Sequence, residues 1–148
     1  ALVAGGLVAP AVFYGSETQP GLAAYVTVWG SGKINVNTAP LPVLQILPGM
    51  TLAMATALVH YRQGPDQQPG TADDQPFREV AELLQVPGIN EADLTRLAGL
   101  VTVVPTAFRS IATGRMPSQQ GGEHVYRRLA MIDRTSSPVQ VRYWRRVE

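Results

Sequence analysis

The 148-residue sequence predicts an α+β protein in which a helical module precedes a small antiparallel β-sheet. A stretch reading LQILPGM recurs 39 residues later as LLQVPGI, with apolar residues at helical spacing around each copy. After Pro105 the apolar pattern alternates instead. The charge changes there too: residues 1–104 carry four basic against eight acidic residues (−4), and 105–148 carry eight against three (+5). We expect a remnant of an earlier helical repeat and strand over 1–31, the helical module over 32–104, and C-terminal strands over 105–148.

The N-terminal segment contains a second, weaker internal sequence similarity. Residues 22–28 read LAAYVTV and resemble residues 97–103, which read LAGLVTV. Each repeat is therefore expected to continue into a helix that is followed by a Val-Thr-Val strand. By this interpretation residues 1–15 are the end of an earlier repeat, with Gly5-Gly6-Leu7 in its turn, and a polar loop follows at residues 16–21.

The first complete repeat begins with a short extended piece, Lys33–Asn37, in which Ile34 and Val36 share a buried face. Asn37 and Thr38 are both candidate caps for a helix starting near Pro40 to Pro42, because proline is tolerated in a first turn. An apolar stripe then predicts the buried side of this helix; it consists of Val43, Leu44, Ile46 and Leu47.

The candidate turn of this repeat comprises Pro48, Gly49, Met50 and Thr51. Thr51 is expected to cap a second helix, whose apolar side contains Ala55, Leu58, Val59 and Tyr61.

Residues 63–76 are rich in Gly, Pro, Gln and Asp, which predicts an exposed loop. Asp66, Asp73 and Asp74 provide the oxygen ligands that calcium prefers, and they are a candidate metal site. Their spacing is not that of an EF-hand, so a solvated acidic loop is the alternative.

The second repeat begins where Phe77 returns to the core. An amphipathic helix is predicted over Glu79–Leu84, with its glutamates outward. The candidate turn comprises Pro87, Gly88, Ile89 and Asn90. Asn90 is expected to cap a helix whose first turn is acidic and whose buried side contains Leu94, Leu97 and Leu100.

Three strands are predicted in the last segment, at 110–116, 125–134 and 139–147. Glycine and proline in the connecting loops favour an antiparallel meander. Val139, Val141 and Tyr143 are expected to face a core, with Arg142 and Trp144 on the opposite face.

The composition gives no indication of catalysis. There are no cysteines, and the two histidines, His60 and His124, lie in different modules without a partner at a catalytic spacing. No phosphate-binding loop, Gly-x-Ser-x-Gly or His-Glu-x-x-His pattern is present. No apolar run reaches the ~18 residues that a membrane span needs. The chain begins with alanine, which indicates a fragment of a longer protein.

The stretch INVNTA…LPG, followed by PF…VAELLQVPGI, resembles a helix-hairpin-helix (SAM-like) domain. The order of modules is similar to minor pseudopilin K of the type II secretion system, over nearly the whole chain. This resemblance implies a pilin-like sheet at residues 105–148 and a periplasmic head whose membrane anchor lies outside this sequence. It also implies a structural protein that caps the pseudopilus tip and binds the I-type and J-type minor pseudopilins, with secreted cargo or the outer-membrane secretin as further partners. Some members of that family bind calcium in this helical region.

DNA binding is the alternative, because residues 32–95 also resemble competence proteins that carry the same hairpin. Hairpins that bind DNA usually read Gly-apolar-Gly, which lets the backbone approach a phosphate closely. Here Thr51 and Asn90 replace the second glycine, and the flanking residues include Glu91 and Asp93. The sequence therefore predicts no nucleic-acid partner at the hairpins. The arginines of the last strands, beside Tyr126, Tyr143 and Trp144, could form a nucleic-acid platform, keep an open sheet soluble or meet acidic partner subunits.

Overall fold

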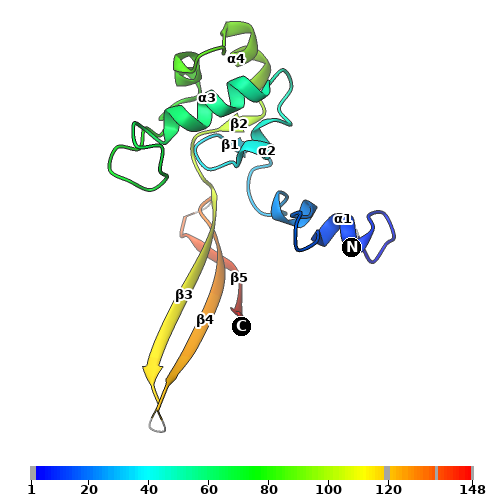
Figure 1. Cartoon of the computed structure of the whole chain (residues 1–148), viewed down its shortest axis with the longest axis vertical. Coiled ribbons are helices and arrows are strands. Elements are labelled where there is room, and N and C mark those ends of the chain that lie inside the picture. Colours follow the sequence, from blue (N-terminus) through cyan, green and yellow to red (C-terminus); the bar gives the residue numbers. More distant parts are fainter. Residues whose placement is uncertain (1–2, 119–120, 136, 148) are drawn as a thin grey trace.

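The computed structural model describes residues 3–118, 121–135 and 137–147. Figure 1 shows a helical module at one end, a long β-ribbon that leads away from it, and an N-terminal arm at its side. The arm contains α1 (Pro10–Tyr14) and a short 3₁₀ segment (Leu22–Ala24), and the helical module contains β1 (Ile34–Asn35), α2 (Leu41–Leu44), α3 (Leu52–Arg62), a second 3₁₀ segment (Val80–Gln85), α4 (Glu91–Leu97) and β2 (Val101–Thr102). The ribbon consists of β3 (Ala107–Pro117), β4 (Glu123–Asp133) and β5 (Gln140–Val147).

The two ends of the helical module are joined by a parallel pair of short strands. β1 pairs with β2 in the register Ile34 to Val101. The Ile34 N–H donates to the Leu100 carbonyl at 2.9 Å, and the Val36 N–H donates to the Thr102 carbonyl at 3.0 Å. Val36 is fully buried and Ile34 is partly buried against the same core, which confirms the extended piece predicted there.

The core is formed by corresponding positions of the two repeats. Leu44 and Leu83 are fully buried, 39 residues apart, and so are Leu58 and Leu97. The same offset relates further buried pairs, Leu47 with Val86 and Met50 with Ile89. The predicted mutual packing of the repeats is therefore confirmed. The other buried apolar residues also lie between positions 36 and 101; they are Val36, Ala39, Met54, Ala55, Phe77 and Val101.

The expected cap of the first helix is wrong. α2 begins at Leu41 after Pro40, and no side chain caps it. The Asn37 side chain bonds instead to Phe77 and Val103, residues far along the chain that a local pattern does not reveal. Ile46, assigned to the buried stripe, is 73% exposed, because the helix ends at Leu44 and the chain turns there.

The helix predicted over Glu79–Leu84 is a 3₁₀ segment at Val80–Gln85. Three-residue hydrogen-bond spacing suits such a short connection better than an α-helix, whose first turn is costly to nucleate. Leu83 is nevertheless fully buried, as expected. α4 ends at Leu97, which leaves Leu100 exposed rather than buried.

The expected Val-Thr-Val strand at residues 26–28 is absent from this described segment, where Val28 is 92% exposed. Its counterpart, β2, has β1 as a hydrogen-bonding partner, whereas residues 26–28 pair with no strand that the structure describes. The expected turn near Gly5-Gly6 does form: the Gly6 N–H donates to the Val3 carbonyl at 3.0 Å.

The antiparallel meander is confirmed, in the order β3-β4-β5. The strands begin and end within a few residues of the predicted limits; residues 119, 120 and 136 of the connecting loops lie outside the described part. The expected common face of Val139, Val141 and Tyr143 is wrong, because a register shift between Met131 and Ile132 places Val141 and Tyr143 on opposite faces of the sheet. All three side chains are exposed. No helix packs over the sheet in the part of the chain that the structure describes (Figure 1).

None of the helices in the described residues is sufficiently long and apolar to span a membrane.

Candidate functional site

The first hairpin turn, Pro48–Thr51, is closed by its own backbone and by a cap. The Met50 N–H donates to the Leu47 carbonyl at 3.1 Å, and Met50 points into the core. Gly49 has a φ of +79°, a conformation that other residues adopt only at a cost. As predicted, the Thr51 hydroxyl accepts a hydrogen bond from the Met54 N–H at 3.2 Å and so caps α3.

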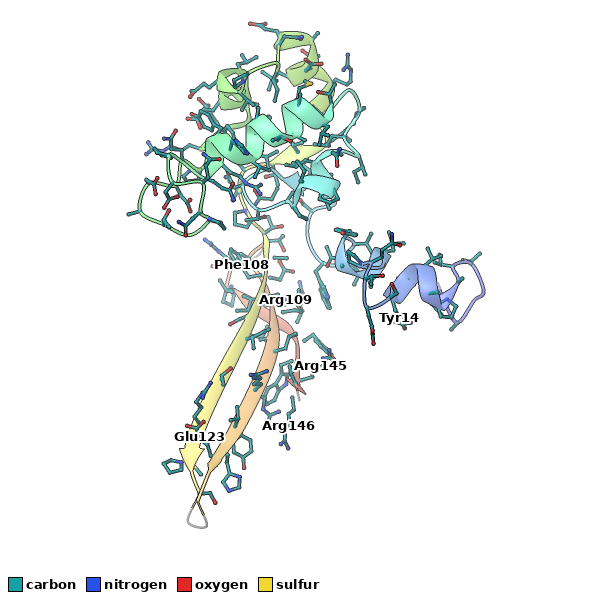
Figure 2. The ribbon with its side chains drawn as sticks, in the orientation of Figure 1. Tyr14, Phe108, Arg109, Glu123, Arg145 and Arg146 are labelled. Carbon is teal, nitrogen blue, oxygen red and sulfur yellow. The ribbon has the colours of Figure 1, made fainter. Side chains whose placement is uncertain are left out.

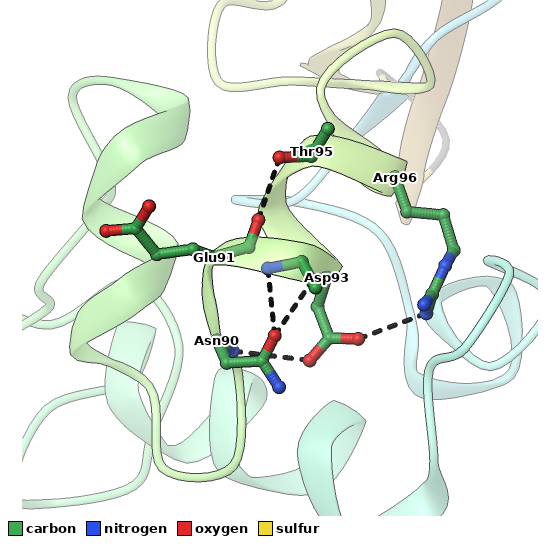
Figure 3. Close-up of polar contacts among 6 residues, drawn as sticks. Asn90, Glu91, Asp93, Thr95 and Arg96 are labelled. Atoms are coloured by element: carbon green, nitrogen blue, oxygen red, sulfur yellow. Dashed lines mark hydrogen bonds and ion pairs between the residues drawn. The ribbon is translucent and has the colours of Figure 1, made fainter.

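The second turn, Pro87–Asn90, has a more complete cap. The Asn90 side-chain oxygen accepts from the N–H groups of Ala92 at 2.9 Å and Asp93 at 3.1 Å. In return the Asp93 carboxylate accepts from the Asn90 N–H at 3.2 Å (Figure 3). This capping box uses the same donors that a phosphate would need at the start of α4.

The two repeats meet at the first turn. The Arg96 guanidinium lies directly against Gly49, so that a side chain at position 49 would collide with it. Arg96 is also paired with Asp93, its Nη1 lying 3.1 Å from the carboxylate oxygen (Figure 3). One arginine therefore links the first turn to the cap of the second, and its charge is already paired with Asp93.

The three aspartates of the 63–76 loop bond to the loop itself. The Asp66 N–H donates to Asp73 at 3.0 Å, the Thr71 hydroxyl donates to Asp73 at 2.7 Å, and the Gly70 N–H donates to Asp74 at 2.7 Å. The Thr71 hydroxyl is the main cause that lowers the pKa of Asp73. No group of three or more acidic or histidine side chains that could hold a metal ion occurs among the described residues. Calcium at these positions stays a prediction.

Arg62, at the end of α3, is a residue that the sequence did not single out. Its guanidinium donates to the Val36 carbonyl at 2.6 Å. Burial lowers its pKa, and the nearby Asp74 carboxylate opposes this shift. Arg62 and Asp74 line a cavity of about 310 Å³ beneath the loop. In the sequence, Arg62 is only a single basic residue at the end of a predicted apolar helix. Many helices end in this way, so the pattern does not predict a cavity.

The histidines do not form a catalytic centre. His60 on α3 and His124 on β4 are both exposed, as expected for surface residues. A larger cavity, of about 390 Å³, lies between residues 27–35 and 102–107. Its lining combines hydroxyl-bearing residues with apolar ones, including Trp29, and Lys33 is its only charged side chain among the described residues. Neither histidine is among the described residues that line the two cavities.

Comparison with known proteins agrees with the geometry of the helical module. Residues 30–102 match the helix-hairpin-helix motif family. Endonuclease/exonuclease/phosphatase family domain-containing protein 1 from Rattus norvegicus is 35% identical over 82 residues, which cover 55% of this chain and 13% of that protein. The Bos taurus protein of the same name is 35% identical over 83 residues, with the same coverage. The match thus spans about an eighth of the length of these relatives. No solved structure matches the chain.

Proposed function

We propose that this chain, whose residues 30–102 carry a helix-hairpin-helix motif, is a structural subunit without catalytic activity, similar to minor pseudopilin K of the type II secretion system. In this proposal the motif packs its two repeats into a rigid block and presents that block to other proteins. The three-stranded sheet is then the end of a pilin-like domain.

The observation that carries the proposal is the state of the α4 N-terminus. A hairpin that binds DNA offers free backbone N–H groups to a phosphate. Here the N–H groups of Asn90, Ala92 and Asp93 already donate to side chains, one of which is the Asp93 carboxylate. A phosphate at this position would displace the cap and face a negative charge, so the turn favours packing over DNA binding.

The sheet supports the same proposal. Antiparallel sheets usually cover one face with a core, whereas most of the apolar side chains of β3, β4 and β5 are at least partly exposed here. A surface of this kind is expected of a subunit that is completed by contacts with neighbouring subunits.

The proposed partners are the I-type and J-type minor pseudopilins, with secreted cargo or the outer-membrane secretin as further contacts. The proposed location is the periplasm, as the head of a protein anchored in the inner membrane. The mechanism is geometric: the helical block lies above the pilin-like sheet and prevents a further subunit from stacking at the tip.

Co-expression with I-type and J-type minor pseudopilins tests the proposal. Size-exclusion chromatography with light scattering is expected to show one complex that contains all three proteins. Failure of this chain to co-elute with either partner, under conditions where the two partners bind each other, would overturn the proposal.

DNA binding is the second candidate, and a specific observation favours it. Arg96 places a guanidinium against Gly49 in the first hairpin turn, where a phosphate would lie. A gel shift with double-stranded DNA that disappears in Arg96→Gln, and that weakens as salt rises, would support this candidate. The proposed structural role predicts no shift for either protein.

A further inference from the structure

The strand register shows that the two faces of the β-sheet differ in their acidic residues. On one face the β4 residues Tyr126, Arg128 and Ala130 lie opposite Gly114, Ala112 and Ser110 of β3. On the β5 side, Arg128 lies opposite Arg146 and Ala130 lies opposite Trp144. We call this the arginine–aromatic face; it is defined by Tyr126, Arg128, Trp144 and Arg146. The strand residues that share it include no acidic side chain in the described part of β3, β4 and β5.

The opposite face is partly neutralised. Glu123 of that face pairs with Arg115 at 3.1 Å, and Asp133 pairs with Arg142 at the same distance. Figure 2 shows Glu123 near the far end of the ribbon, while Arg145 and Arg146 lie beside β5. The arginine–aromatic face therefore has no carboxylate to pair with its arginines in the described strands, whereas the opposite face, which also holds Arg109, Arg127 and Arg145, contains two.

On this face, two arginine side chains stack on aromatic rings. The Arg128 guanidinium carbon lies 5.1 Å from the centre of the Trp144 ring, and that of Arg146 lies 5.4 Å from the centre of the Tyr126 ring. Stacking on aromatic rings fixes each guanidinium and leaves its N–H groups free for a carboxylate. It also brings two like charges, Arg128 and Arg146, directly opposite each other, which costs stability unless a negative group joins them.

A strip of small residues lies next to these arginines. Ser110, Ala112 and Gly114 are small, and a side chain added at Gly114 would meet nothing within 4 Å. Trp144 is 67% exposed, and Met116 and Val141 on the same face are also exposed. A polypeptide can therefore approach the backbone of β3 closely while its acidic side chains reach the arginines.

We infer that the arginine–aromatic face docks an acidic, amphipathic protein segment of a partner subunit. This inference deepens the proposed function, because it gives the chemistry of one partner contact. A second copy of the sheet is a poor occupant, since it would place arginine against arginine. Single-stranded nucleic acid fits less well too, because the guanidinium groups already cover one face of the rings on which bases would stack.

The test uses the full chain and a fluorescein-labelled helical peptide that carries glutamates on one side and leucines on the other. A peptide with glutamine in place of glutamate is the control probe, and oligothymidylate is the competing probe. Fluorescence anisotropy is expected to show binding of the glutamate peptide only, weakening as NaCl rises from about 50 to about 300 mM. Binding of oligothymidylate but not of the peptide would overturn the inference.

The chain provides a matched pair of double variants. Arg128→Gln with Arg146→Gln removes the charge of the proposed face, whereas Arg127→Gln with Arg145→Gln removes the same charge from adjacent positions on the other face. The first is expected to weaken peptide binding about tenfold, as loss of charge-assisted contacts predicts, and the second less than about twofold. Equal losses in both would show that net charge, and not this face, binds the peptide.

A third variant keeps every charge and tests the strip. Gly114→Leu fills open space opposite Tyr126 and is expected to abolish peptide binding without changing the circular dichroism spectrum. In a Trp29→Phe background, binding is also expected to change the fluorescence of Trp144. Unchanged affinity in Gly114→Leu would contradict docking on this face. The formation of a complex with pilin-like partners is measured separately, so the inference and the proposed function can fail independently.

Discussion

Asn37 and Phe77 are joined by two hydrogen bonds across forty residues of sequence. The Phe77 N–H donates to the Asn37 side-chain oxygen at 2.8 Å, and the Asn37 amide nitrogen donates to the Phe77 carbonyl at 2.8 Å. The same nitrogen donates to the Val103 carbonyl at 3.2 Å. One side chain therefore ties the start of the first repeat to the end of the loop and to the segment that follows β2.

Asn37→Ala is expected to destabilise the helical module by roughly 2 to 3 kcal/mol, because it leaves partly buried backbone groups of Phe77 and Val103 without partners. Urea unfolding measures the change. Gln75→Ala, at an exposed side chain of the same loop, is the control and is expected to have little effect. Equal effects of the two substitutions would contradict the bridging role of Asn37.

The internal repeat yields a second prediction. Leu58 and Leu97 are fully buried at corresponding positions, so Leu58→Ala and Leu97→Ala are each expected to cost about 2 to 5 kcal/mol. Leu52→Ala, on the exposed side of α3, is the control for changes in helix propensity. Thermal and urea unfolding would contradict the shared core if one of the two buried substitutions behaved like the control.

These residues also show which features the sequence could predict. The turns, the caps at Thr51 and Asn90, and the pairing of the core by a 39-residue offset depend on local chemistry and periodicity, and they are found as predicted. Asn37 was expected to cap a helix because its local sequence permits it. It bonds instead to Phe77, and that contact depends on how the loop folds back.

The site itself was only partly predictable. The candidate turn residues have the expected conformations, but the Arg96 contact with Gly49 joins two repeats and has no local pattern. Arg62 and its cavity depend equally on tertiary packing. The distribution of acidic and basic residues between the two faces of the sheet required the strand register, because Arg127 and Arg128 are neighbours in sequence and lie on opposite faces.

Gly49 provides a third prediction. Gly49→Ala must adopt a φ of +79° and also displace the Arg96 guanidinium, so we expect a loss of at least about 1 kcal/mol. Gly99→Ala has open space and no positive φ, and it is the matched control. A chemical denaturation experiment that found Gly49→Ala as stable as Gly99→Ala would show that the turn tolerates a side chain.

The acidic loop gives a prediction for pH dependence. Hydrogen bonds from the Thr71 hydroxyl and then the Asp66 N–H lower the pKa of Asp73 below its ordinary value of 3.8. The unfolded chain therefore takes up this proton at a higher pH than the folded chain does. The stabilising contribution is fully present above the ordinary pKa and is lost as the pH falls through the lower, folded-state value.

The melting temperature is accordingly expected to fall as the pH is lowered from about 5 to about 3, and to fall less steeply in Asp73→Asn. The pKa of Asp133 is also lowered, mainly by the Thr135 hydroxyl. The Asp73→Asn protein is therefore expected to keep part of its acid sensitivity. The double variant with Asp133→Asn should therefore show the shallowest dependence. Glu17→Gln, at an exposed position of the N-terminal arm, is the control and should follow the unmodified protein. If Asp73→Asn has the same acid dependence as that control, the loop hydrogen bonds do not contribute to stability.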